Sequence, residues 1–158
     1  MSVVTSIHVT EDISLITFKD LPTRLSVISD IFNQFAKAGI NIDMISQTAP
    51  HSSQVSVSFS MSDGEFVKVL EIVNAYRKEH TSIKTMISSG NCKIQLYGEE
   101  MRHVPGVAAR AIAAVAGSGA EITLITTSEV DISLLVPEAA LEAALAALES
   151  EFSVKASV

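Results

Sequence analysis

Apolar residues in the first half of the chain switch between the two-residue spacing of strands and the three-to-four-residue spacing of helices. The predicted elements are, in order, a strand at residues 15–18, a helix over 25–35, strands at 40–44 and 55–59, a helix over 66–73 and a strand at 83–87. Gly39 is placed to end the first helix, and Ser62 or Asp63 can cap the second. This order, β-α-β-β-α-β, is that of a ferredoxin-like unit.

The second half repeats the same order. Its predicted elements are a strand at residues 94–98, a helix from Pro105 to about residue 118, strands at 122–125 and 132–136, and a helix that starts at Pro137. Val27 aligns with Val107, 80 residues later, and Gly39 aligns with Gly119 in the same register. The position of the glycine and the apolar pattern recur although few identities do, so we interpret the chain as two copies of one unit.

The second copy lacks an obvious last strand, while residues 2–9 form an alternating strand that the first copy does not need. We therefore expect a first unit of residues 13–89, inserted in a second unit of residues 90–152 whose sheet the strand 2–9 completes. Residues 153–158 are the alternative source of that strand. The predicted class is α+β, with antiparallel sheets and helices on one face of each. We place the boundary between the units at residues 88–91.

Alanine-rich helices at residues 108–116 and 139–147 are more apolar than a solvated helix requires. We expect them to mediate packing between the units and pairing with a second chain.

Composition narrows the class of protein. The chain has 158 residues, 47% of them apolar, and a net charge of -7, which suits a globular fold and disfavours nucleic acid as a partner. The single cysteine, Cys92, excludes a disulfide framework within one chain and a multi-cysteine zinc site. No apolar run approaches the roughly 20 residues of a membrane span, and no secretory leader is evident, so we expect a cytoplasmic protein that does not bind membranes.

Catalytic motifs are missing from the sequence. It contains no phosphate-binding GxxxxGK[ST], no GxGxxG, no GxSxG, and no histidine pair at metal-ligand spacing. We predict no catalytic residue, no metal and no cofactor. An enzymatic alternative could rest only on Cys92 and His103, as a nucleophile and its base. For a cysteine that opens a strand, an inert buried thiol is the commoner role.

Two segments of the second unit are suited to a small charged ligand. The loop MRHVPGV, residues 101–107, leads into a helix whose first N–H groups can bind a carboxylate, and Gly106 permits close approach to the backbone. The segment TTSEV, residues 126–130, offers hydroxyls and the Glu129 carboxylate, which suit an ammonium group. Together they could hold an amino-acid zwitterion, although a polar turn and an ordinary helix start would explain the same residues.

The segments NIDMISQ, SDGE, MRHVPGVAARA and ITLITTSEV resemble the tandem regulatory ACT domains of aspartokinases. The resemblance runs from the first strand to Phe152. It implies one ACT unit inserted in the other, dimers formed through ACT units, and lysine or threonine bound at ACT interfaces to inhibit an attached kinase. The catalytic half of an aspartokinase is not present in this chain.

The resemblance also implies effector contacts, by position. In the second unit they are Met101, His103, Gly106, Val107, Thr127, Ser128, Glu129 and Ile122. In the first unit they are Asn41, Ile42, Asp43 and Gln47, the last in the place of Thr127.

The first unit departs from the family at the loop before its helix. The family's Asp-Lys-Pro-Gly is replaced by Thr23, Arg24, Leu25 and Ser26, and Glu121 stands where the family often has asparagine. Loss of a charge-assisted hydrogen bond of roughly 1.5–3 kcal/mol would weaken binding at that loop by more than tenfold.

The expected function is therefore a regulatory, amino-acid-binding module of aspartokinase type, with lysine as the first candidate ligand and threonine as the second. Expected partners are a second copy of the chain and an aspartokinase catalytic domain, either in the same polypeptide or separate. The alternative is a dimerisation module, or a free-standing ACT protein, that has lost or changed its ligand.

Overall fold

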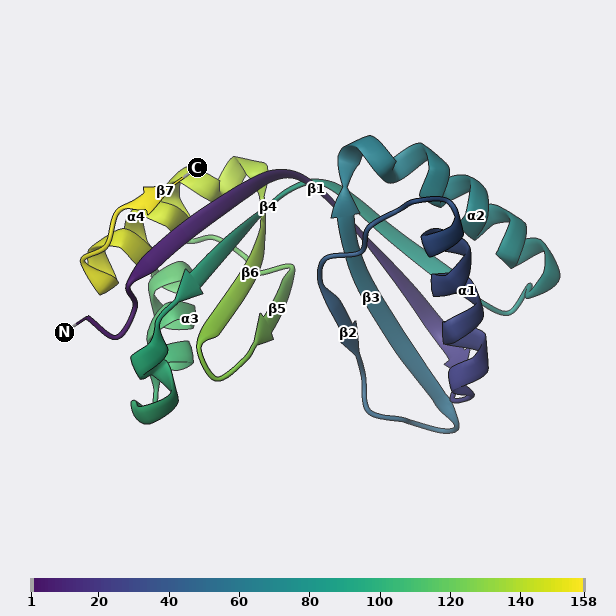
Figure 1. The fold of residues 1–158 in the computed structure, drawn as a ribbon, viewed down its shortest axis with the longest axis horizontal. Helices are drawn as coiled ribbons and strands as arrows, with labels where there is room; N and C mark the ends of the chain where they lie inside the picture. Colours follow the sequence, from purple (N-terminus) through teal and green to yellow (C-terminus); the bar gives the residue numbers. More distant parts are fainter. Residues whose placement is uncertain (1, 158) are drawn as a thin grey trace. The chain divides into compact units, whose positions relative to one another are not determined.

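The computed structural model describes residues 2–157, and the chain forms two compact units (Figure 1). One, which we call the inserted unit, contains residues from Asp12 to Ser89. The other, the outer unit, joins the N-terminal stretch up to Glu11 to the residues from Gly90 onward. Two strands are shared, because β1 (Ser6–Pro22) runs from the outer into the inserted unit and β4 (Lys84–Tyr97) runs back.

The inserted unit contains, between those strands, α1 (Leu25–Lys37), β2 (Ile45–Gln47), β3 (Gln54–Ser62), the 3-10 turn η1 (Asp63–Glu65) and α2 (Phe66–Glu79). β3 pairs antiparallel with β1, where Ile16 lies opposite Phe59, and with β2. Because alternate residues share a face, Val57, Phe59 and Met61 all point at the helices and are buried. The rings of Phe35 and Phe59, 5.2 Å apart, join α1 to the sheet.

Two helix ends follow the sequence signals. Gly39 lies just after α1 with φ 72°, and Gly119 lies just after α3 with φ 78°, the left-handed conformation in which glycine ends helices without strain. The Ser62 hydroxyl accepts a hydrogen bond from the Gly64 N–H (3.3 Å), and the 3-10 turn then delays α2 to Phe66.

The strand predicted at residues 40–44 is wrong in its bounds. Regular pairing with β3 begins only at Ile45, although Ile40 and Met44 are buried as the apolar pattern requires. The cause is local, because the Ser60 hydroxyl, rather than a backbone carbonyl, accepts the N–H of Met44 (3.0 Å).

The outer unit contains η2 (Glu99–His103), α3 (Val107–Gly117), β5 (Leu124–Thr127), β6 (Asp131–Pro137), η3 (Glu138–Ala140), α4 (Leu141–Phe152) and β7 (Ala156–Ser157). Its strands lie in the order β7-β1-β4-β6-β5. The predicted helix starts at Pro105 and Pro137 are both too early, since α3 begins at Val107 and a 3-10 turn separates Pro137 from α4.

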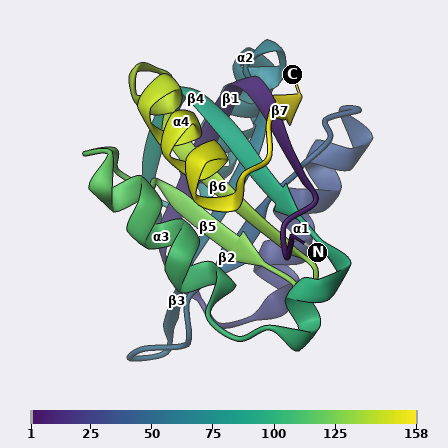
Figure 2. The same cartoon turned by 90° about the vertical axis from the view of Figure 1, so that its left-hand side faces the viewer.

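Helices α3 and α4 lie side by side on one face of the outer unit's sheet (Figure 2). Ala111 and Ala144 are fully buried in the core that these helices form with Leu134 and Leu148. Arg110 of α3 forms an ion pair with Glu151 of α4 (2.7 Å), and its guanidinium lies 4.8 Å from the centre of the Phe152 ring. The small alanines thus let two helices of one unit approach closely. The packing between units and the pairing with a second chain that the sequence predicts for these helices stay predictions.

Both candidates for the outer unit's last strand lie in its sheet. The N-terminal part of β1 lies beside β4, with the Thr5 N–H donating to the Tyr97 carbonyl (2.8 Å), and β7 adds to β1 in parallel through Ile7 and His8. The predicted boundary at residues 88–91 lies inside β4, which continues without a loop. Gly90 (φ 67°) and Asp12 (φ 56°) have left-handed backbone where the two strands pass between the units.

The α+β class, with antiparallel sheets each carrying helices on one face and one unit inserted in the other, is confirmed. None of the helices within residues 2–157 combines the length and the hydropathy that a bilayer crossing requires.

Gly98 provides a test of the outer unit's packing. A Cβ on Gly98 would lie 1.9 Å from the Val3 carbonyl oxygen and 3.1 Å from the Val4 Cα, both backbone atoms. We expect Gly98→Ala to lower the free energy of unfolding by about 1–3 kcal/mol or more, measured by urea denaturation, because the N-terminal stretch must move.

Gly117→Ala is the matched control. A Cβ there meets nothing within 4 Å, and the residue ends α3. Alanine should leave stability unchanged or raise it by up to about 1 kcal/mol through its higher helix propensity. Equal losses in the two variants would contradict the close approach of Val3 to Gly98.

Candidate functional site

A cavity of about 180 Å³ lies in the outer unit, where the start of α3 faces the turn between β5 and β6. Its walls come from three segments of the chain: the loop before α3, the first turn of α3, and the β5–β6 hairpin. The lining residues are Met101, Val104, Gly106, Val107, Ala108, Thr127, Ser128, Glu129 and Ile132.

Strand register brings these segments together. β4 and β5 both pair antiparallel with β6, with Tyr97 opposite Asp131 and Thr127 opposite Ile132. The end of β4 and the hairpin turn therefore share one edge of the sheet, and the Gly98 N–H donates to the Val130 carbonyl across that edge (2.9 Å). The loop that follows β4 must start beside the turn.

Local contacts fix the loop between β4 and α3. The Met101 N–H donates to the Gly98 carbonyl (3.1 Å), and the Met101 side chain, of which 9% is exposed, belongs to the unit's core. Arg102 forms an ion pair with Glu99 (2.7 Å). The Tyr97 hydroxyl donates to the Glu99 carboxylate, and this hydrogen bond is the main reason that the pKa of Tyr97 is raised above its usual value.

Gly106 turns the chain into α3 with φ 88°, a left-handed conformation that costs other residues about 1 kcal/mol or more. The Gly106 carbonyl accepts the first bond of the helix, from the Arg110 N–H (3.0 Å). The N–H groups of Val107, Ala108 and Ala109 precede that bond and have no partner within the helix. Val107 and Ala108 line the cavity, so the start of α3 gives it backbone donors and the positive end of the helix dipole.

The hairpin turn forms the opposite wall. The Ser128 N–H donates to the Asp131 carbonyl (2.8 Å), and the Val130 N–H donates to the Ser128 hydroxyl (3.3 Å). These bonds satisfy the turn's own backbone. Glu129 is the single charged side chain among the residues that line the cavity, and it is exposed to solvent.

The start of α3, with its backbone donors, and the Glu129 carboxylate both line this cavity and define the chemistry that it can bind. Its volume equals that of about six water molecules at about 30 Å³ each, which suits a small metabolite. An anionic group fits the helix start, a cationic group fits Glu129, and Met101, Val104 and Ile132 supply an apolar wall. Within residues 2–157, no three His, Cys, Asp or Glu side chains gather as metal ligands would.

Six of the sequence-predicted residues meet at this cavity: Met101, Gly106, Val107, Thr127, Ser128 and Glu129. His103 belongs to η2 but is exposed and is not among the lining residues. Ile122 lies between α3 and β5, where its half-buried side chain packs against the unit's core.

Three lining residues were missed from the sequence: Val104, Ala108 and Ile132. Ile132 could have been found by counting, because a hairpin that contains Thr127 must place a residue of the next strand opposite it. Val104 lies within the quoted loop, but its spacing does not show the direction in which its side chain points.

The other predicted residues belong to the inserted unit. Asn41 and Asp43 are exposed, and Ile42 packs against that unit's core. The Asp43 N–H donates to the Ser60 carbonyl (3.0 Å), and Gln47 lies opposite Val57 in β2. The role of these four residues as effector contacts remains a prediction.

Comparison with known proteins places this site in a family. The model of the ACT domain matches residues 94–152, which hold the whole cavity. The aspartokinase of Geobacillus stearothermophilus is 32% identical over 146 residues, an alignment that covers 87% of this chain and 35% of that protein. The chain thus spans about a third of the length of that relative.

Solved structures of similar length match the whole fold. The regulatory subunit of aspartate kinase from Thermus thermophilus, in a ligand-free form, is 30% identical with a TM-score of 0.85, and the match covers 95% of this chain and 99% of that one. A structure of aspartokinase alpha and beta subunits gives 29% identity and a TM-score of 0.84 with the same coverage. The chain belongs to the family of aspartate kinase regulatory regions built from ACT domains, and it matches the regulatory part of those enzymes rather than the catalytic part.

Proposed function

We propose that this chain senses a free amino acid through the cavity of the outer unit and passes the signal to an aspartate kinase. The observation that carries the proposal is one cavity of about 180 Å³ that the first residues of α3 and Glu129 line together. Membership of the regulatory family supports a binding role rather than a catalytic one.

The proposed ligand lies with its α-carboxylate at the first turn of α3, where the backbone donors and the helix dipole favour negative charge. Its ammonium group lies toward Glu129 and the hydroxyls of Thr127 and Ser128. Lysine is the first candidate, because the sequence predicts two acidic contacts, Glu129 and Asp43, one for each of its ammonium groups. Threonine is the second candidate, because its hydroxyl can exchange hydrogen bonds with the two hydroxyl side chains.

We further propose that the ligand acts by differential affinity. Binding shifts the kinase only to the extent that the ligand prefers one of two conformational states, and that preference is the coupling free energy. The proposed partners are a second copy of this chain, paired through ACT units, and an aspartokinase catalytic domain. His103, Ile122, Asn41, Ile42, Asp43 and Gln47 remain predicted contributors to the effector site, and the cytoplasmic location remains a prediction.

A thermal-shift series against the twenty amino acids tests the sensing role. A ligand present at one hundred times its Kd, and bound only to the folded state, stabilises the protein by roughly 2.7 kcal/mol. We expect lysine or threonine to raise the melting temperature by several degrees, and their D-enantiomers to have a smaller effect. A flat response to all twenty would refute amino-acid binding.

Glu129→Gln tests the cationic end of the site. Replacing the carboxylate by an amide removes the negative charge that faces the ligand's ammonium group and leaves a weaker hydrogen bond to a neutral oxygen, so the Kd of the ligand should rise about tenfold in a calorimetric titration. Glu142→Gln, an exposed acid on α4 outside the cavity, is the control and should leave the Kd unchanged. If both variants behave alike, Glu129 does not contact the ligand.

A second function, a dimerisation module without a ligand, is favoured by the first turn of α1. Leu25 is 72% exposed there, and Arg24 caps the helix without a side-chain hydrogen bond. This apolar position stands in the loop that departs from the family pattern. The two functions differ in sedimentation, since a dimer that neither lysine nor threonine changes would favour the second.

A further inference from the structure

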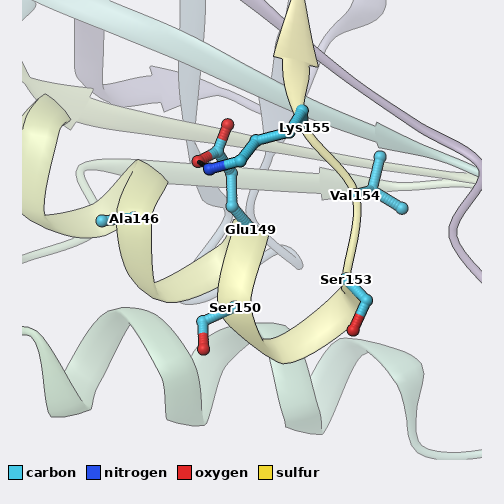
Figure 3. Close-up of a pocket in the computed structure, with 6 residues that line it drawn as sticks. All are labelled: Ala146, Glu149, Ser150, Ser153, Val154 and Lys155. Atoms are coloured by element: carbon cyan, nitrogen blue, oxygen red, sulfur yellow. Dashed lines mark hydrogen bonds and ion pairs between the residues drawn. The ribbon is translucent and has the colours of Figure 1, made fainter.

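The end of the described chain contacts α4 at Glu149. The Glu149 carboxylate, in the last turn of α4, accepts the N–H of Ala156 on Oε1 (2.8 Å) and the ammonium of Lys155 on Oε2 (2.9 Å). Figure 3 shows Lys155 bending back over Glu149, while Ser150 and Ser153 point away from that pair. We call residues 154–157 the strap.

These contacts are specific to the folded strap. Ser153 reverses the chain after α4 with φ 55°, and the Val154 N–H donates to the Glu149 carbonyl (3.3 Å). The hydrogen bond from the Ala156 N–H, followed by that from Lys155, lowers the pKa of Glu149 below its usual value, so both contacts favour the charged carboxylate.

The strap pairs with the sheet over a short length. Among the described residues, β7 pairs with β1 at Ile7–Ala156 and His8–Ser157, and the Ser157 hydroxyl lies 3.4 Å from the Ile7 carbonyl oxygen and 3.3 Å from His8 Nδ1. The Lys155 side chain is 88% exposed, and Val154 and Ala156 pack against the unit's core while only half-buried. The small buried area means that the strap can leave at a modest cost in free energy, whereas the edge of β1 beneath it is part of the core sheet.

The strap is also an addition to the repeated fold. In the inserted unit the strands lie in the order β4-β1-β3-β2, which completes a β-α-β-β-α-β unit, and the outer unit has the matching four strands plus β7. Removing the strap would leave Ile7 and its neighbours with backbone groups open for pairing, and such an edge accepts extended chains.

Space for a larger occupant lies beside the strap. An open cavity of about 460 Å³ runs along α4, lined by Ala146, Glu149, Ser150, Ser153, Val154 and Lys155. The strap forms one wall of this cavity and leaves it unfilled, so an extended segment in its place would have room for longer side chains than Val154.

We propose that Glu149 and the adjoining edge of β1 form a strand-addition site, which the strap occupies as an internal ligand and which takes an extended segment of another polypeptide in its place. The incoming segment runs parallel to β1, as β7 does. It carries a lysine or arginine followed by a small residue, because Glu149 pairs with a cation and with the next backbone N–H. This site is separate from the amino-acid cavity, with which it shares no lining residue.

The substitution Ala156→Pro, made in the full chain, weakens the binding of the strap to this site. Proline removes the N–H that Glu149 accepts, and it leaves Glu149 and β1 unchanged. A fluorescent peptide with the sequence of residues 152–157 should bind this variant at least about tenfold more tightly than the wild-type chain, by fluorescence anisotropy.

Two further changes, one in the chain and one in the peptide, test the recognition chemistry, and Glu142→Gln serves as the control. Adding Glu149→Gln to the Ala156→Pro variant should weaken peptide binding about tenfold, and a peptide with alanine at the Lys155 position should lose a similar factor. Adding Glu142→Gln instead should have no effect. If Ala156→Pro binds the peptide no better than the wild-type chain, or if Glu149→Gln and Glu142→Gln act alike, the strand-addition site is refuted.

Hydrogen exchange in the unmodified chain gives an independent test that needs no variant to fold. The Ala156 amide should exchange at least about a hundredfold faster than the amide of Leu134 in the central strand β6, because the strap opens without global unfolding. Equal protection of the two amides would overturn the proposal, since the strap would then be a fixed part of the sheet.

Discussion

Antiparallel pairing of β6 with both β4 and β5 is the constraint on which the candidate site depends. The pairs Leu96–Ile132 and Thr127–Ile132 fix where β4 ends and where the hairpin turns, and both points fall at one sheet edge. The loop that follows must then start beside the turn, and Gly106 directs the first N–H groups of α3 toward it. A shift of one residue in this register would turn Thr127 and Ile132 to the other face of the sheet and dismantle the cavity.

Much of this architecture could be predicted from the sequence, because residues such as Val57 and Phe59 alternate strictly and Gly39 and Gly119 end their helices. The full lengths of β1 and β4 could not. Polar residues interrupt the apolar alternation of each strand, at Thr10, Glu11 and Asp12 in one and at residues 88–91 in the other. Backbone pairing continues through these stretches without any help from apolar side chains, so the sequence shows a boundary where the structure has a strand.

Of the candidate site, too, one part could be predicted from the sequence and another could not. Residues placed by a turn or a helix start, such as Gly106 and Glu129, could be identified because their chemistry is local. The surroundings of Ile122 and His103 could not be predicted, because the direction of a side chain near the end of an element depends on packing. The Ile122 side chain packs against the core, and His103 is exposed to solvent. The four residues predicted from the inserted unit stay a prediction, because local spacing describes one part of the chain at a time.

The two strands that pass between the units also limit how such a protein can change in length. Left-handed backbone at Asp12 and at Gly90 sets the phase of the alternation on either side of each passage. If one residue were inserted there without a compensating bulge, every later side chain of the strand would point to the opposite face of the sheet. The hairpin loop around Ser52 and Ser53 has no such constraint and can lengthen freely. Natural variation in chain length should therefore accumulate in the loops and be nearly absent at these two passages.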